Sequence, residues 1–183
     1  MTRRGSPQVV ILCEDRAHYH FARKFLQLHG VTNIHQRVAP LGKGAGESWV
    51  RRQYPAEVQA QRARARYQNV GLIVMIDADR YGVRDRKDQL DAALTAWGPP
   101  LGEREADERI AVFAPKWSIE TWFRFLDGVD CHEDTSYRND YREARPTEFA
   151  RRLFDRCRAG KPLGDAPPSL SDACNEWPRL EVG

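Results

Sequence analysis

Cysteine and long apolar runs are scarce in this sequence. The 183 residues contain only four cysteines, which lie far apart and form no C-x-x-C pair. This spacing argues against a structural zinc site and predicts reduced thiols in a cytoplasmic protein. The longest apolar run, residues 70–76, is much shorter than the ~20 residues of a membrane-spanning helix. The two arginines near the start are not followed by the apolar segment of a signal peptide, so we expect no membrane partner.

Lysine is also rare, since it provides only five of the 29 basic side chains and arginine provides the other 24. Arginine binds phosphate through two hydrogen bonds, but a GC-rich genome explains a general arginine excess equally well. The distribution is more informative than the total. Residues 51–66 and 138–158 are basic, and residues 77–108 between them are acidic. Six basic residues form either a candidate nucleic-acid surface or a solvated basic helix face with a mobile loop. They are Arg51, Arg52, Arg62, Arg64, Arg66 and Lys43.

Short apolar strands alternate with amphipathic helices along the first two thirds of the chain. The strands are predicted at residues 9–13, 33–39, 70–76 and 110–114, with helices near 16–29, 47–67, 86–97 and 119–126. This order predicts an α/β fold with a mostly parallel central sheet of about four strands flanked by helices. We expect one domain over residues 1–183, with a core at about 8–126 and a C-terminal helical extension at 127–183. Ser169 or Ser171 is expected to cap the last helix.

Acidic residues follow two of the predicted strands. Glu14 and Asp15 end the first strand, and Asp77 and Asp79 end the third. Ligands of open parallel sheets lie beyond the carboxyl ends of the strands. Alternate strand residues point to the same face, so Asp77 and Asp79 project together if the strand geometry continues. Such carboxylates need a cation, and oxygen ligands favour Mg²⁺ or Mn²⁺. The simpler alternative is a D-x-D turn or helix cap.

The glutamate after the first strand and the D-x-D after a later apolar strand resemble the Toprim domain. Residues 13–15 and 75–82 occupy these two places, and residues 118–120 match the S-x-E that OLD-type nucleases carry after a further strand. The resemblance implies metal ligands at Glu14, Asp77 and Asp79, with Ser118 and Glu120 completing a second metal position. It implies a metal-dependent nuclease acting on DNA or RNA, of the kind found in bacterial antiviral defence, with an ATPase partner.

The sequence departs from that family at several positions. The family's usual glycine after the first glutamate is Asp15, and its second acid four residues on is His18. His18 either faces the site, where it would bind metal or move a proton, or is a solvated helix residue. The late lysine that stabilises charge at the scissile phosphate in OLD-type nucleases has only Lys161 as a candidate, because no other lysine follows Lys116.

Two other functions compete with the nuclease. A receiver-like phosphoacceptor domain would use Glu14 and Asp15, Asp77 and Lys116. A non-catalytic subunit with a Toprim-like core would bind a partner or nucleic acid, and His18 in place of the second acid favours this reading. The metal hypothesis requires that Glu14 lies within coordination reach of the segment 77–79.

Overall fold

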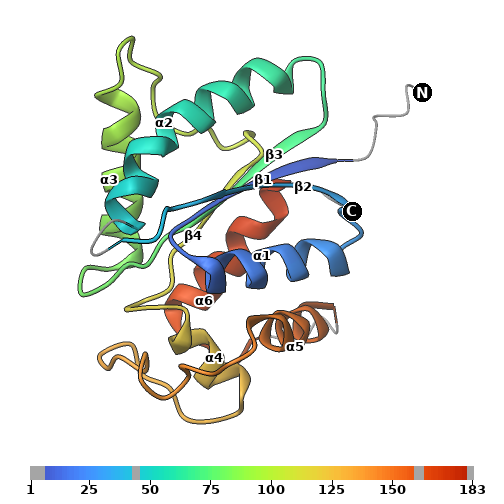
Figure 1. Cartoon of the computed structure of the whole chain (residues 1–183), viewed down its shortest axis with the longest axis vertical. Helices are drawn as coiled ribbons and strands as arrows, with labels where there is room; N and C mark the ends of the chain where they lie inside the picture. The colour runs from blue at the N-terminus through green and yellow to red at the C-terminus, as the bar shows by residue number, and fades with distance from the viewer. Residues whose placement is uncertain (1–6, 43–45, 159–162, 181–183) are drawn as a thin grey trace.

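The computed structural model describes residues 7–42, 46–158 and 163–180. Within these ranges the strands form one four-stranded parallel sheet (Figure 1). The sheet order is β2-β1-β3-β4, with the bounds β1 (Gln8–Cys13), β2 (Asn33–Val38), β3 (Val70–Met75) and β4 (Ile110–Phe113). The predicted α/β class and the four predicted strands are confirmed. The wholly buried strand β3 lies inside the sheet, as its continuous apolar run predicts.

Helices cover both faces of the sheet. Helices α2 and α3 lie on one face, and α1 lies on the other together with the C-terminal helices (Figure 1). The bounds are α1 (Arg16–Leu28), α2 (Gly46–Ala65), α3 (Val83–Thr95), α4 (Glu120–Leu126), α5 (Pro146–Arg158), α6 (Pro168–Glu176) and the 3-10 turn η1 (Trp177–Leu180). No helix within the described ranges has both the length and the apolarity needed to cross a bilayer.

The alternation of the strands divides the core into two layers. Val9, Ile11 and Cys13 of β1 face the layer that contains α1. Val10 and Leu12 face the layer that contains α2 and α3. Because both faces of the central strands are buried, both sets of alternating residues are apolar.

The residues after α4 pack into the first of these layers. Phe149 and Leu153 of α5 and Leu170 of α6 are buried in the same cluster as the α1 side chains. The expected cap of α6 is wrong: the helix begins at Pro168, and its N-cap residue is Pro167. The Ser169 hydroxyl instead accepts a hydrogen bond from Trp122 Nε1 at 2.8 Å.

Glu176 fixes the end of α6 to the sheet. Its carboxylate accepts hydrogen bonds from Lys87 Nζ at 3.0 Å, from the Val112 backbone N–H at 3.1 Å and from the Arg104 guanidinium. Only 7% of Glu176 is exposed. Burial alone would raise the pKa of Glu176, but the bonds from Arg104 and Val112 hold it below its ordinary value.

Replacing Glu176 by glutamine is therefore expected to lower the free energy of unfolding at neutral pH by about 3 kcal/mol, because Lys87, Arg104 and Arg179 lose a buried anionic partner. Since the folded-state pKa is lowered, this stability is present above the ordinary pKa and is lost as pH falls through the folded value. The difference in the free energy of unfolding between wild type and Glu176→Gln should therefore become smaller below roughly pH 4. Urea unfolding measures both effects, and Glu143→Gln on the exposed surface is the control. Equal stability of Glu176→Gln and wild type at neutral pH would contradict this role.

Candidate functional site

The two acidic strand ends meet where the chain leaves the sheet in opposite directions. After β1 the chain enters α1 on one face, and after β3 it enters α3 on the other (Figure 1). Adjacent strands whose connections diverge in this way leave a crevice at their carboxyl ends, which is the usual ligand position in open α/β sheets. Glu14 and Asp77 border this crevice.

Glu14 lies directly against the segment that follows β3. The strands β1 and β3 are paired, with Cys13 opposite Met75. One residue further on, Glu14 Oε1 accepts a hydrogen bond of 2.7 Å from the backbone N–H of Asp77. The required proximity of Glu14 to segment 77–79 is therefore met. Burial and the neighbouring Asp77 carboxylate raise the pKa of Glu14 to about 8, which marks a position where a further positive charge would be stabilising.

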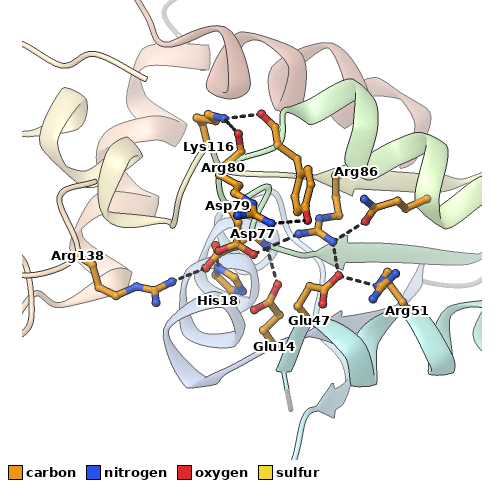
Figure 2. A network of polar contacts seen from close by, with 12 residues as sticks. Glu14, His18, Glu47, Arg51, Asp77, Asp79, Arg80, Arg86, Lys116 and Arg138 are labelled. Carbon is orange, nitrogen blue, oxygen red and sulfur yellow. Dashed lines mark hydrogen bonds and ion pairs between the residues drawn. The ribbon is translucent and has the colours of Figure 1, made fainter. Parts of the chain in front are cut away.

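Asp77 is buried and contacts two cationic side chains. His18 Nε2 lies 3.0 Å from Asp77 Oδ1, and Arg138 Nη2 donates to Asp77 Oδ2 at 3.2 Å (Figure 2). His18 is fully buried, so the alternative of a solvated helix histidine is wrong. Burial lowers the pKa of His18, but the Asp77 and Asp15 carboxylates outweigh burial and raise it to about 10. His18 thus contacts Asp77 from the buried side, and it is not among the described residues that line the pocket.

Asp79 leaves the strand geometry. Its φ of 49° is left-handed, so the expected strand alternation does not continue to Asp79, although both aspartates line the same pocket. Asp79 Oδ2 instead accepts from Arg86 Nη2 at 3.2 Å. Arg86 is only 1% exposed, and it also contacts Glu47 and Gln89 (Figure 2). Arg86 therefore fixes Asp79 and the start of α2 together.

A second left-handed residue lies beside Asp79. Trp117 has a φ of 63°, and its backbone N–H donates to Asp79 O at 3.2 Å. Such a conformation costs of order 1–3 kcal/mol per residue and is found mainly at functional sites. The turn is followed by Ser118, whose side chain is almost fully buried and whose Oγ has no hydrogen-bond partner within the described part of the chain. A buried hydroxyl without a protein partner is available to a water molecule or to another ligand.

The segments after β1, β3 and β4 border one open pocket of about 570 Å³. Its lining includes Glu14, Asp77, Asp79, Ser118 and Glu120, five of the six expected metal ligands. His18 is not part of the lining. The other lining residues are Asp15, Gly42, Gly46, Glu47, Ile119 and Arg138. Asp15 has a structural role, because its carboxylate caps α1 by accepting from the His18 backbone N–H at 2.9 Å.

The acidic side chains are not arranged as a complete metal-binding cluster. Across residues 7–42, 46–158 and 163–180, no three His, Cys, Asp or Glu side chains are grouped as metal ligands. Asp77 and Asp79 instead contact His18, Arg138 and Arg86. Basic side chains of the protein thus neutralise part of the negative charge of these carboxylates.

The expected arginine surface is divided along α2. Arg51 Nε pairs with Glu47 at 2.6 Å at the pocket end of the helix, and Arg52 is exposed nearby. Arg62 and Arg64 lie in the last turn of α2, and Arg66 follows the end of the helix. There Arg62 donates to Glu108 and to backbone carbonyls, and Arg64 donates to Ala60 O. Arg62 therefore makes a structural contact with Glu108 rather than presenting a free phosphate-binding group. Lys43 and Lys161 lie outside the described residues.

Sequence reasoning did not identify Glu47, Arg86 and Arg138 as site residues. Arg138 was included only in a basic stretch, and no motif distinguishes any of the three. Lys116, the candidate lysine of a receiver-like site, donates to Arg80 O at 2.8 Å and to Tyr81 O. Lys116 is not among the described residues that line the pocket.

Gly46 brings the start of α2 against Glu14. A Cβ atom at position 46 would lie 3.1 Å from Glu14 Cβ and 3.3 Å from Glu14 Oε2. Gly46→Ala is thus expected to displace the Glu14 carboxylate and to weaken Mn²⁺ binding severalfold, as measured by calorimetry. Gly42→Ala is the matched control, because it borders the same pocket and nothing lies within 4 Å of its added Cβ. Equal Mn²⁺ affinities of the two variants would show that the close contact between Gly46 and Glu14 does not matter for metal binding.

Comparisons with protein-family models, curated proteins and solved structures found no match for this chain.

Proposed function

We propose that this protein is a divalent-metal-dependent phosphodiesterase that cleaves DNA or RNA. The observation that carries the proposal is the convergence of Glu14, Asp77 and Ser118 from three distant segments on one open pocket. The pocket lies at the diverging strand ends, where the fold itself favours a ligand. The unpartnered Ser118 hydroxyl and the left-handed residues beside it support a functional rather than a purely structural role.

The side chains of the pocket suit a hard cation. Glu14, Asp77 and Asp79 would hold it, and Ser118 and Glu120 border the same space. All of these donors are oxygen atoms, which favours Mg²⁺ or Mn²⁺ over zinc. When bound, such an ion polarises a phosphoryl oxygen and lowers the pKa of water.

The protein's own groups prepare the carboxylates for this role. His18 fixes Asp77 from behind, and Arg86 fixes Asp79 from the side of α3. Without a bound cation the carboxylates of the pocket repel a phosphodiester. Nucleic-acid binding is therefore proposed to depend on the cation, which makes a chelator a direct test.

The biological setting is proposed from the Toprim resemblance. A small nuclease of this kind would act in the bacterial cytoplasm in antiviral defence, with an ATPase partner that supplies recognition or control. The described carboxylates of the pocket suit the phosphodiester of either DNA or RNA, so the proposed activity covers both.

A second candidate is a non-catalytic binding subunit. The cations that already contact Asp77 and Asp79 favour this alternative, because they balance the buried charge without a metal. In that case the role of these three basic residues, His18, Arg86 and Arg138, would be to stabilise the segments that follow β1 and β3.

Incubation of the full chain with supercoiled plasmid and with single-stranded RNA tests the choice. The assay compares Mn²⁺, Mg²⁺ and a chelator, each with and without a candidate ATPase partner. Cleavage that requires Mn²⁺ or Mg²⁺ and is lost in Asp79→Asn supports the phosphodiesterase. Asparagine tolerates the left-handed backbone of position 79, so this variant should fold. Binding without cleavage under every condition favours the non-catalytic subunit.

A further inference from the structure

Arg138 is the one cationic side chain among the described residues that line the pocket. It comes from the irregular connection between α4 and α5 and reaches Asp77 from the side opposite Arg86 (Figure 2). Its side chain is 61% exposed, whereas the Asp77 side chain is 6% exposed. The carboxylate is thus fixed in the protein, and its arginine partner extends from the solvent.

The three cations around the aspartates differ in their freedom to move. His18 is fully buried and Arg86 is 1% exposed, and Arg86 also contacts Glu47 and Gln89. Arg138 makes its hydrogen bond to a single oxygen, Asp77 Oδ2. The Arg138 guanidinium is largely in solvent, so it regains hydration when it leaves Asp77. Arg138 can therefore leave Asp77 at a small cost, whereas the other two cannot.

We propose that Arg138 is the phosphate-binding side chain of this site and that a divalent cation releases it from Asp77. The inference rests on the proposed function. In the resting state Arg138 neutralises Asp77 Oδ2, the oxygen that His18 leaves available. Asp77 Oδ2 would help to hold a divalent ion, whose charge would replace that of Arg138 at this carboxylate. The Arg138 guanidinium would then be free to donate two hydrogen bonds to a phosphodiester.

The charge of the pocket explains why such an exchange is useful. Six carboxylates border the space, from Glu14, Asp15, Glu47, Asp77, Asp79 and Glu120. The negative charge of these carboxylates repels a phosphate until bound cations reduce that charge. Releasing Arg138 only when the metal arrives couples substrate binding to metal binding.

Calorimetry with Mn²⁺ alone tests the competition. Arg138→Ala is expected to bind Mn²⁺ about two- to fivefold more tightly than wild type, because the competing cation is removed. Arg142→Ala is the matched control, since Arg142 lies in the same connection and pairs with Asn139. Unchanged or weaker Mn²⁺ binding by Arg138→Ala would mean that Arg138 merely supports Asp77, and would overturn the inference.

Fluorescence anisotropy with a labelled DNA oligonucleotide in Ca²⁺ tests the phosphate contact. Arg138→Ala is expected to bind about tenfold more weakly, and the slope of log affinity against log salt should fall by about one. Arg138→Lys keeps the charge and should keep the slope. A slope unchanged in Arg138→Ala would contradict the phosphate contact. Failure of the wild-type protein to bind any Mn²⁺ would instead overturn the proposed function itself.

Discussion

Replacement of Asp77 by asparagine is expected to reduce metal-dependent phosphodiester cleavage by more than a hundredfold. Loss of a residue that only supports a metal ligand typically costs about 10- to 100-fold, so loss of a ligand should exceed that range. Asparagine has almost the same shape and can still contact His18 and Arg138, but it provides no negative charge to a cation. Cleavage of a labelled oligonucleotide in Mn²⁺ measures the effect.

Asp15→Asn is the control for Asp77→Asn. Asp15 borders the same pocket, but its carboxylate caps α1, and asparagine is an equally good helix cap. This variant should retain the fold and most of the activity. Comparable loss in both variants would show that the general acidity of the pocket matters rather than a ligand at Asp77. Full activity of Asp77→Asn would exclude Asp77 from the metal site.

Replacement of His18 by alanine is expected to weaken Mn²⁺ binding about 10- to 100-fold. His18 is fully buried and holds Asp77 Oδ1 at 3.0 Å, so its removal frees the carboxylate to rotate. It also leaves a buried charge with only the exposed Arg138 as a cationic partner, which is expected to lower the free energy of unfolding by about 3 kcal/mol. Calorimetry and urea unfolding measure the two effects.

His18→Gln separates positioning from stability. The glutamine amide can reach Asp77 with an N–H donor and fills most of the space. It should therefore restore most of the Mn²⁺ affinity that alanine removes. If His18→Ala folds and binds Mn²⁺ as tightly as wild type, His18 does not position a metal ligand. If glutamine fails to restore binding although the protein is stable, the hydrogen bond is not what matters.

The sheet and the first carboxylates could be predicted from the sequence because they depend on local patterns. A continuous apolar run such as residues 70–75 indicates a buried parallel strand, and the residue that follows it must lie at the carboxyl edge. The pairing of β1 with β3, which the sequence leaves open, then brings Glu14 beside Asp77. The position of the candidate site is thus a consequence of the fold.

The cations of the site could not be predicted, because they come from segments without a periodic pattern or from helix faces that appear solvated. Arg138 belongs to a long irregular connection, and Arg86 is one of three basic residues in the charged helix α3. The direction of the Asp79 side chain depends on the left-handed backbone of Asp79 itself, whose carbonyl accepts a hydrogen bond from the Trp117 N–H. Such details follow from tertiary contacts rather than from the local sequence.

The excess of arginine is explained in part by its internal contacts. Arg62, Arg86 and Arg104 pair with carboxylates in partly or fully buried positions. The planar guanidinium can bind several acceptors at once, which suits such positions better than an ammonium group. A basic stretch in this sequence is therefore a poor guide to a nucleic-acid surface, as the contacts of Arg62 show.

The most direct test of a cation at the ends of β1 and β3 is an anomalous diffraction map of crystals soaked in Mn²⁺. The account predicts a peak in the pocket between the carboxylates of Glu14 and Asp77, with Arg138 moved away from Asp77 Oδ2. A map without a peak in this pocket at saturating Mn²⁺, with Arg138 still bound to Asp77, would contradict it.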